Sequence, residues 1–179
     1  NADEAILEAY PELDRMRSEG IIKAIGVGMN QCETPTRVIK ETDIDMVLIA
    51  GRYSLLDQKA LEGLFPAALE RNVDILAAGV FNSGILANPV KGATYDYAPA
   101  SDELLAKAVR IREVLDGHHV SLTSAALQFP LRHPAVTSVL TGSRNSKELL
   151  ANMADFDLEL PEDIWNQLED AGLIEKMSL

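Results

Sequence analysis

The sequence lacks several features that mark whole classes of protein. It has one cysteine, Cys32, in 179 residues, so no disulfide can form within the chain, which is typical of the reducing cytoplasm. It has 16 lysines and arginines against 28 aspartates and glutamates, a formal charge of −12, and no basic cluster. Long-range repulsion therefore argues against nucleic acid or an anionic membrane as a partner and favours a small molecule.

Membrane, targeting and common cofactor motifs are also missing. No apolar run reaches the ~20 residues that a helix needs to cross a bilayer. The first ten residues, NADEAILEAY, are acidic and lack the basic and apolar blocks of a secretion signal. No metal-ligand spacing, GxGxxG motif or P-loop lysine occurs. At 47% hydrophobic content the chain can still bury a core, and we expect residues 1–179 to form one globular α/β domain.

What the chain does contain is a strand-turn-helix unit that occurs four times. Short apolar runs predict strands at residues 21–27, 45–50, 73–78 and 136–140. Helical spacing of apolar residues predicts helices at 4–19, 34–42, 57–71, 103–116 and 122–131, and from Pro161 onward. Such apolar strands indicate a parallel sheet with right-handed crossovers, which an open doubly wound sheet and half of a (β/α)₈ barrel both provide.

Each predicted strand ends in glycine and small polar residues, where ligands bind in either fold: GMNQ, GRYS, GVFNSG and TGSRNS. In the last of these, residues 141–143 predict a turn, and Ser146 is expected to cap the next helix. The unpaired N–H groups of a helix start suit a phosphate. Asn152 lies near enough for a long ligand to contact it. An ordinary βα unit would show the same pattern.

Two further segments have more than one interpretation. Tyr53 follows a strand end, and it either lines a site or packs under a loop. A loop of roughly twenty residues, through GATYDYAPAS, precedes a helix that Ser101 is expected to cap. Its length predicts a lid or a binding role rather than a simple connection.

Five segments, in this order, resemble the carboxyl-terminal part of the aldo-keto reductases, in particular the branch of L-fucose and D-threo-aldose dehydrogenases. They are IKAIGVGMNQ, RYSLLDQ, AAGVFNSGIL with TYDYAP beyond it, AALQFPLRHPAV and TGSRNSKELLANM. The resemblance implies a (β/α)₈ TIM-barrel fold, of which this chain supplies roughly strands 5 to 8 with their outer helices. It also implies an NAD(P)-dependent oxidoreductase with a carbonyl or sugar substrate.

The resemblance further implies a cofactor site at the strand ends. The implied cofactor-binding residues are Asn30, Gly79, Phe81, Ser83, Gly142, Ser143, Arg144, Glu148 and Asn152. The turn at Gly79 to Ser83 would lie along the diphosphate, and Asn152 would contact the adenine. Ala50 and Ala78 stand where the family usually has a glutamine and a nicotinamide-stacking aromatic, so Phe81 is the nearer aromatic candidate.

The family's catalytic tetrad lies on its first four strands, and none of those motifs occurs here. The chain therefore resembles a fragment or truncated product that keeps the cofactor site without the proton donor, and we expect no catalytic residue in it. The alternative is a non-catalytic half barrel that binds nucleotide or acts as an interaction module. Open strand edges and an uncovered barrel interior predict self-association or pairing with the missing half.

Cofactor preference depends on the predicted turn at residues 141–143 and the helix that follows it. Many NADP-dependent members of the family place a lysine near Gly142 and an arginine near Glu148, and neither cation is present. The Glu148 carboxylate would repel a 2′-phosphate, whereas it can accept a hydrogen bond from a ribose 2′-hydroxyl, so NAD is favoured over NADP. Ser143 and Arg144 act in the opposite direction, because a hydroxyl and a guanidinium can bind phosphate.

Overall fold

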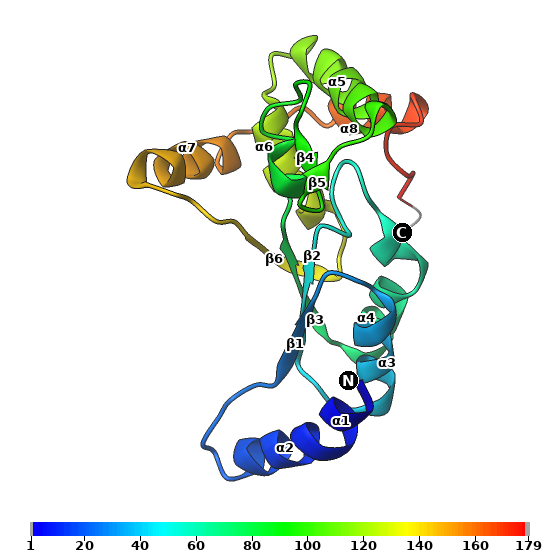
Figure 1. Cartoon of the computed structure of the whole chain (residues 1–179), viewed down its shortest axis with the longest axis vertical. Coiled ribbons are helices and arrows are strands. Elements are labelled where there is room, and N and C mark those ends of the chain that lie inside the picture. Colours follow the sequence, from blue (N-terminus) through cyan, green and yellow to red (C-terminus); the bar gives the residue numbers. More distant parts are fainter. Residues whose placement is uncertain (1, 178–179) are drawn as a thin grey trace.

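The computed structural model describes residues 2–177, and a four-stranded parallel sheet lies at its centre (Figure 1). The strands are β1 (Gly26–Met29), β2 (Met46–Ala50), β3 (Asp74–Ala78) and β6 (Val136–Leu140), in the order β1-β2-β3-β6. Each neighbouring pair is parallel. The four carboxyl ends therefore share one edge of the sheet, which confirms the parallel βα arrangement that the sequence predicts.

Helical segments connect and flank these strands. They are α1 (Ala2–Glu4), η1 (Ala5–Ala9), α2 (Tyr10–Ser18), α3 (Glu33–Glu41), η2 (Lys59–Glu62), α4 (Leu64–Arg71), η3 (Asn82–Gly84), α5 (Asp102–Asp116), α6 (Leu122–Gln128), η4 (Phe129–Arg132), α7 (Ser146–Phe156) and α8 (Asp163–Asp170). The long loop after β3 contains a small antiparallel hairpin of β4 (Thr94–Tyr95) and β5 (Ala98–Pro99). Ser101 caps α5 as predicted, because its side chain accepts a hydrogen bond from Leu104 N.

The two faces of the sheet differ in how well they are covered. Val47, Ile49 and Ile75 alternate onto one face and are at most 1% exposed. Helices α3 and α4 pack against each other and lie beside the sheet (Figure 1). On the opposite face the register places Gly28 next to Leu48, and the first is exposed while the second is half-buried. Within residues 2–177 the sheet thus has one packed face and one largely open face.

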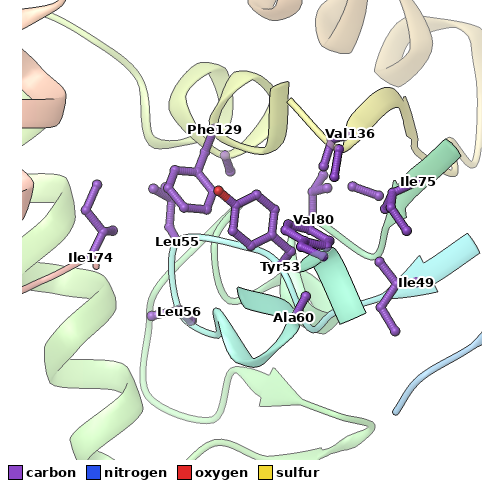
Figure 2. Packing of buried hydrophobic residues seen from close by; sticks show 14 of the residues in the cluster. Ile49, Tyr53, Leu55, Leu56, Ala60, Ile75, Val80, Phe129, Val136 and Ile174 are labelled. Atoms are coloured by element: carbon purple, nitrogen blue, oxygen red, sulfur yellow. The ribbon is translucent and has the colours of Figure 1, made fainter. Parts of the chain in front are cut away.

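An aromatic cluster supports the loop after β2. Tyr53 is 1% exposed, and its ring centroid lies 4.6 Å from that of Phe65 and 5.0 Å from that of Phe129. Figure 2 shows Tyr53 among Leu55, Val80 and Phe129 in the core. Burial raises the pKa of Tyr53 to about 12. Of its two interpretations, the structure therefore selects packing under a loop.

The first strand differs from its prediction. A strand at residues 21–27 is wrong, because Ile21 is 62% exposed and β1 starts only at Gly26. The ladder begins where Gly26 meets Met46 of β2, and the residues before it have no neighbouring strand. An apolar run shows where a strand can form, but the position of its partner decides where pairing begins.

Proline divides two of the predicted helices. The helix expected at 57–71 is η2 followed by α4, and α4 begins just before Pro66. Likewise α6 ends before Pro130, and a 3₁₀ turn continues the chain. Since proline has no N–H and its ring clashes with the preceding turn, it is tolerated in a first turn and not in a helix interior. Pro11 also lies in the first turn of its helix, after the π-helical η1.

Candidate functional site

A cavity of about 610 Å³ lies at the carboxyl ends of β3 and β6. Its walls are the turn after β3, the turn after β6, α7, and Thr123 near the start of α6. Its volume falls within the range of pockets that hold cofactors and other small ligands. Seven of the nine residues predicted to bind a cofactor line it: Gly79, Phe81, Ser83, Gly142, Arg144, Glu148 and Asn152.

The other two predicted residues lie elsewhere. Ser143 stands just behind the wall, where its hydroxyl accepts a hydrogen bond from Asn152 Nδ2 at 3.3 Å. Asn30 lines a different and larger cavity of about 770 Å³, at the ends of β1 and β2. Asn30 is therefore not brought together with the others, because β1 and β6 are opposite edges of the sheet.

The turn after β3 brings its backbone close to neighbouring strands. Gly79 has φ +63°, and a Cβ there would lie 3.1 Å from Gly51 N, so a larger residue would be both strained and crowded. Asn82 and Ser83 also have positive φ angles, of 46° and 58°. Non-glycine residues rarely adopt this conformation, and where they do it is a frequent feature of ligand sites.

Asn82 contributes an unused hydrogen-bond acceptor to this turn. Asn82 is 3% exposed, and its Nδ2 donates to Gly51 O at 3.3 Å. That contact orients the amide and leaves Oδ1 without a partner among residues 2–177. Because an unpaired buried acceptor is costly, the site suits a ligand that donates an N–H or O–H group. The sequence analysis missed Asn82, although GVFNSG contains it.

The N-cap residue of helix α7 lies one position earlier in the sequence than predicted. Asn145, and not Ser146, is the N-cap, and its Oδ1 accepts from Glu148 N at 3.0 Å. Both residues are good caps by type. The extended backbone of Asn145, with φ −158° and ψ 168°, decides between them, because Ser146 is already helical.

The two residues with opposite expected effects on cofactor choice bind each other. Arg144 Nε donates to Glu148 Oε1 at 3.0 Å, and Arg144 N donates to Glu148 Oε2 at 2.9 Å. The side-chain hydrogen bond from Arg144 lowers the pKa of Glu148 and keeps it ionised. The Arg144 side chain is highly exposed. Solvent therefore screens the ion pair between Arg144 and Glu148, and the pair contributes little to stability.

The larger cavity is organised by Arg52, which the sequence analysis did not identify. Its guanidinium donates to Asn30 O at 2.7 Å, to Asp57 Oδ2 at 3.2 Å and to Asp96 Oδ2 at 2.6 Å. Tyr95 OH donates to Asp57 Oδ2 at 2.9 Å. The β4–β5 hairpin is thereby tied to the end of β2, so the long loop covers this cavity and its tip is anchored.

The Cys32 thiol is not an activated nucleophile. Cys32 lines the larger cavity, where burial raises its pKa to about 11, so the thiol stays protonated near neutral pH. Within residues 2–177, no three His, Cys, Asp or Glu side chains are grouped as a metal site requires. In the same residues no helix is long and apolar enough to cross a bilayer.

Comparison with known proteins relates most of the chain to one family. The model of the Aldo/keto reductase family matches residues 1–172. D-threo-aldose 1-dehydrogenase from a Pseudomonas species is 41% identical over 174 residues, which are 96% of this chain and 53% of that protein. Pyridoxal 4-dehydrogenase from Microbacterium luteolum is 42% identical over 166 residues, which are 92% and 48%. The chain thus spans about half the length of the curated relatives it matches.

Solved structures show the same relation at the level of the fold. The holo form of an aldo-keto reductase from Bacillus halodurans matches with a TM-score of 0.75 and 21% identity, over 95% of this chain and 57% of that one. Glycerol dehydrogenase from Gluconobacter oxydans matches with a TM-score of 0.67 and 18% identity, over 92% and 53%. At these identities the likeness concerns the fold alone.

Proposed function

Because this chain belongs to the aldo/keto reductase family, we propose that it supplies the cofactor-binding part of an NAD(P)-dependent oxidoreductase that acts on a carbonyl or sugar substrate. The observation that carries the proposal is the gathering of seven predicted residues in one cavity at the strand ends. The names of the two relatives, an aldose dehydrogenase and a pyridoxal dehydrogenase, support an aldehyde or a sugar as the substrate class.

We place the four strands as roughly strands 5 to 8 of a (β/α)₈ barrel. Two observations support this placement. The parallel sheet matches about half of a solved aldo-keto reductase chain, and the face that carries Gly28 and Leu48 is open as a barrel interior would be. Pairing with a second half, or with another copy of the chain, would cover that face and satisfy the edges of β1 and β6.

The cavity residues fit an extended dinucleotide. The Gly79 to Ser83 turn allows close backbone approach along a diphosphate, and the start of α7 adds N–H groups that favour anions. Asn152, on the wall formed by α7, would contact the adenine. Asn82 Oδ1 can accept a hydrogen bond from a ribose hydroxyl or a carboxamide. When bound, a nicotinamide cofactor supplies the hydride acceptor or donor.

In this proposal the residues that line the 610 Å³ cavity bind and orient the cofactor, and they do not move a proton. The titratable side chains that line the 610 Å³ cavity are Arg144 and Glu148, and these two are paired with each other. A proton donor for the carbonyl oxygen would therefore come from the other half of the barrel. We also propose NAD as the preferred cofactor, since Glu148 remains ionised beside the position expected for the ribose.

A second candidate function is nucleotide binding without catalysis. The observation that favours it is that the titratable side chains lining the 610 Å³ cavity, Arg144 and Glu148, are paired with each other. In that case the same cavity holds the nucleotide, and the open sheet face binds a protein partner. For both candidate functions we propose the cytoplasm as the location, because the single cysteine of the chain cannot form a disulfide within it.

Calorimetric titration of the purified chain with NAD⁺ and NADP⁺ tests the proposal. We expect saturable binding of NAD⁺ that weakens about tenfold in Asn152→Ala, because a ligand donor or acceptor loses its partner. Asn166→Ala is the matched control, since Asn166 is an exposed amide on α8, away from both cavities. Equal binding by the two variants, or no binding by the wild-type chain, contradicts a cofactor site in this cavity.

A further inference from the structure

Helix α7 forms one wall of the cavity, yet apolar packing contributes little to its position. None of its residues is buried. Its four large apolar side chains, Leu149, Leu150, Met153 and Phe156, are 49%, 65%, 54% and 40% exposed. In Figure 1 α7 stands apart from α3 and α4, at the end of the long connection from β6. A helix is normally held by its buried apolar face, so α7 needs another attachment.

That attachment is Asp155, in the last turn of α7. Its carboxylate accepts hydrogen bonds from three hydroxyls at the start of α6: from Thr123 Oγ1 at 2.6 Å, from Ser124 Oγ at 2.8 Å and from Ser121 Oγ at 3.3 Å. Ser124 is completely buried, so this end of the contact is fixed to the core. Hydrogen bonds to a carboxylate are shorter and stronger than those between neutral groups.

Gln128, at the other end of α6, completes the attachment. Its Nε2 lies 3.2 Å from Asp155 O, 3.0 Å from Phe156 O and 2.8 Å from Leu158 O, so it satisfies carbonyls at the end of α7. These contacts join α7 to α6 at one end. The opposite end of α7, with Glu148, lies against the cavity.

The contact between Asp155 and the start of α6 also involves a residue that lines the cavity. Thr123 lines the cavity and donates to Asp155, and Asn152 lines it one helical turn before Asp155. The carboxylate therefore links two walls of the cavity that are 29 positions apart in the sequence, counted from Thr123 to Asn152. Loss of the link would let α7 pivot about the turn at residues 141–145 and carry Asn152 away from the turn after β3.

We propose that Asp155 is a positioning residue for cofactor binding, which through Thr123 and Ser124 sets the place of α7 and hence the affinity for the adenosine end of a dinucleotide. This inference rests on the proposed function, because it assigns α7 to the adenosine end. Asp155 touches no ligand in this scheme. It acts through Asn152, whose placement to within a fraction of an ångström decides whether its hydrogen bond forms.

The test compares affinities for two halves of the cofactor. In the full chain, Asp155→Ala is expected to weaken binding of NAD⁺ and ADP-ribose about tenfold, the effect of a lost hydrogen-bonded contact. Binding of nicotinamide mononucleotide, followed by NMR titration, should stay unchanged, because the turn after β3 is intact. Asp155→Asn retains one acceptor and should restore part of the loss. Asp157→Ala, which removes an exposed carboxylate two residues away, is the matched control.

Each outcome separates this inference from the function on which it rests. If the wild-type chain binds ADP-ribose and Asp155→Ala binds it equally well, the positioning role is overturned while the cofactor site stands. If both half-ligands lose affinity together and amide exchange in β3 accelerates, Asp155 is a general stabiliser and the inference is also overturned. If the wild-type chain binds neither NAD⁺ nor ADP-ribose, the proposed function fails and the inference fails with it.

Discussion

The two cavities at the carboxyl edge of the sheet differ in how much hydrogen-bonding capacity they leave for a ligand. In the larger one the Arg52 guanidinium and the Asp57 carboxylate are used by neighbouring side chains and backbone. In the smaller one Arg144 and Glu148 bind each other, but the buried Oδ1 of Asn82 has no partner among the described residues. Unused polar groups, more than volume, therefore indicate where a ligand belongs.

The largest expected effect concerns the smaller cavity, whose titratable side chains are the paired Arg144 and Glu148. The chain alone should not oxidise an aldose with NAD⁺ or NADP⁺ at a rate near that of an intact family member, because a general acid is worth on the order of 10² to 10⁴ in rate. The absorbance of the reduced nicotinamide cofactor, followed over time, gives the rate. Robust turnover without an added partner would refute this expectation.

Arg52→Met should destabilise the fold strongly. It leaves Asp57, whose side chain is 7% exposed, without its cation, and removal of one partner from a buried ion pair costs about 3 kcal/mol or more. Urea unfolding measures the loss. Arg15→Met is the control, because Arg15 pairs only with exposed carboxylates and should cost less than about 1 kcal/mol.

The same Arg52 variant sharpens the comparison between the cavities. If the larger cavity is structural, folded Arg52→Met should still bind NAD⁺ with the wild-type dissociation constant at low temperature. Weaker binding with unchanged urea unfolding would instead make the larger cavity the ligand site.

Glu148→Arg tests the charge argument in the smaller cavity. In the complete enzyme it should shift the ratio of KM values toward NADP by about tenfold, because a cation replaces a carboxylate near the 2′-phosphate and charged hydrogen bonds are worth about 1.5–3 kcal/mol. It also frees Arg144, which now pairs with Glu148. Glu159→Arg adds the same charge at an exposed position after α7 and serves as the control. An unchanged ratio would show that Glu148 does not face the ribose.

The smallest effect is a pH dependence of stability in the aromatic cluster. His133 packs against Phe65 at 4.5 Å between ring centroids, and burial lowers its pKa. The folded state therefore binds fewer protons than the unfolded state, so stability is complete above about pH 6.5 and falls as the pH drops below it, by at most about 1.4 kcal/mol per pH unit. Urea midpoints between pH 5 and pH 8, at about unit steps, measure this slope.

Substitution separates the contribution of His133 from that of His119. His133→Asn should remove the slope, whereas His119→Asn should retain it, since His119 is exposed and asparagine tolerates its positive φ of 58°. A slope that survives in His133→Asn assigns the effect to another group.

Local patterns in the sequence predicted the elements that depend on neighbours along the chain. The apolar strands and their glycine-rich ends predicted four parallel βα units, and Ser101 was placed correctly as a cap because capping involves the next three residues only. Most of the candidate site could also be predicted from local patterns. The carboxyl ends of parallel strands meet at one edge, so residues after β3 and β6 come together wherever those strands are neighbours.

Contacts between distant segments were decided only by the tertiary structure. Neighbours along the chain do not reveal that Arg52 binds Asp96, or that Thr123 binds Asp155. The position of β2 set the start of β1, and the position of β1 at the far edge separated Asn30 from the other predicted residues. Residue type and spacing determine which local structure can form, whereas the partner of a long side chain depends on how whole elements pack, which periodicity does not encode.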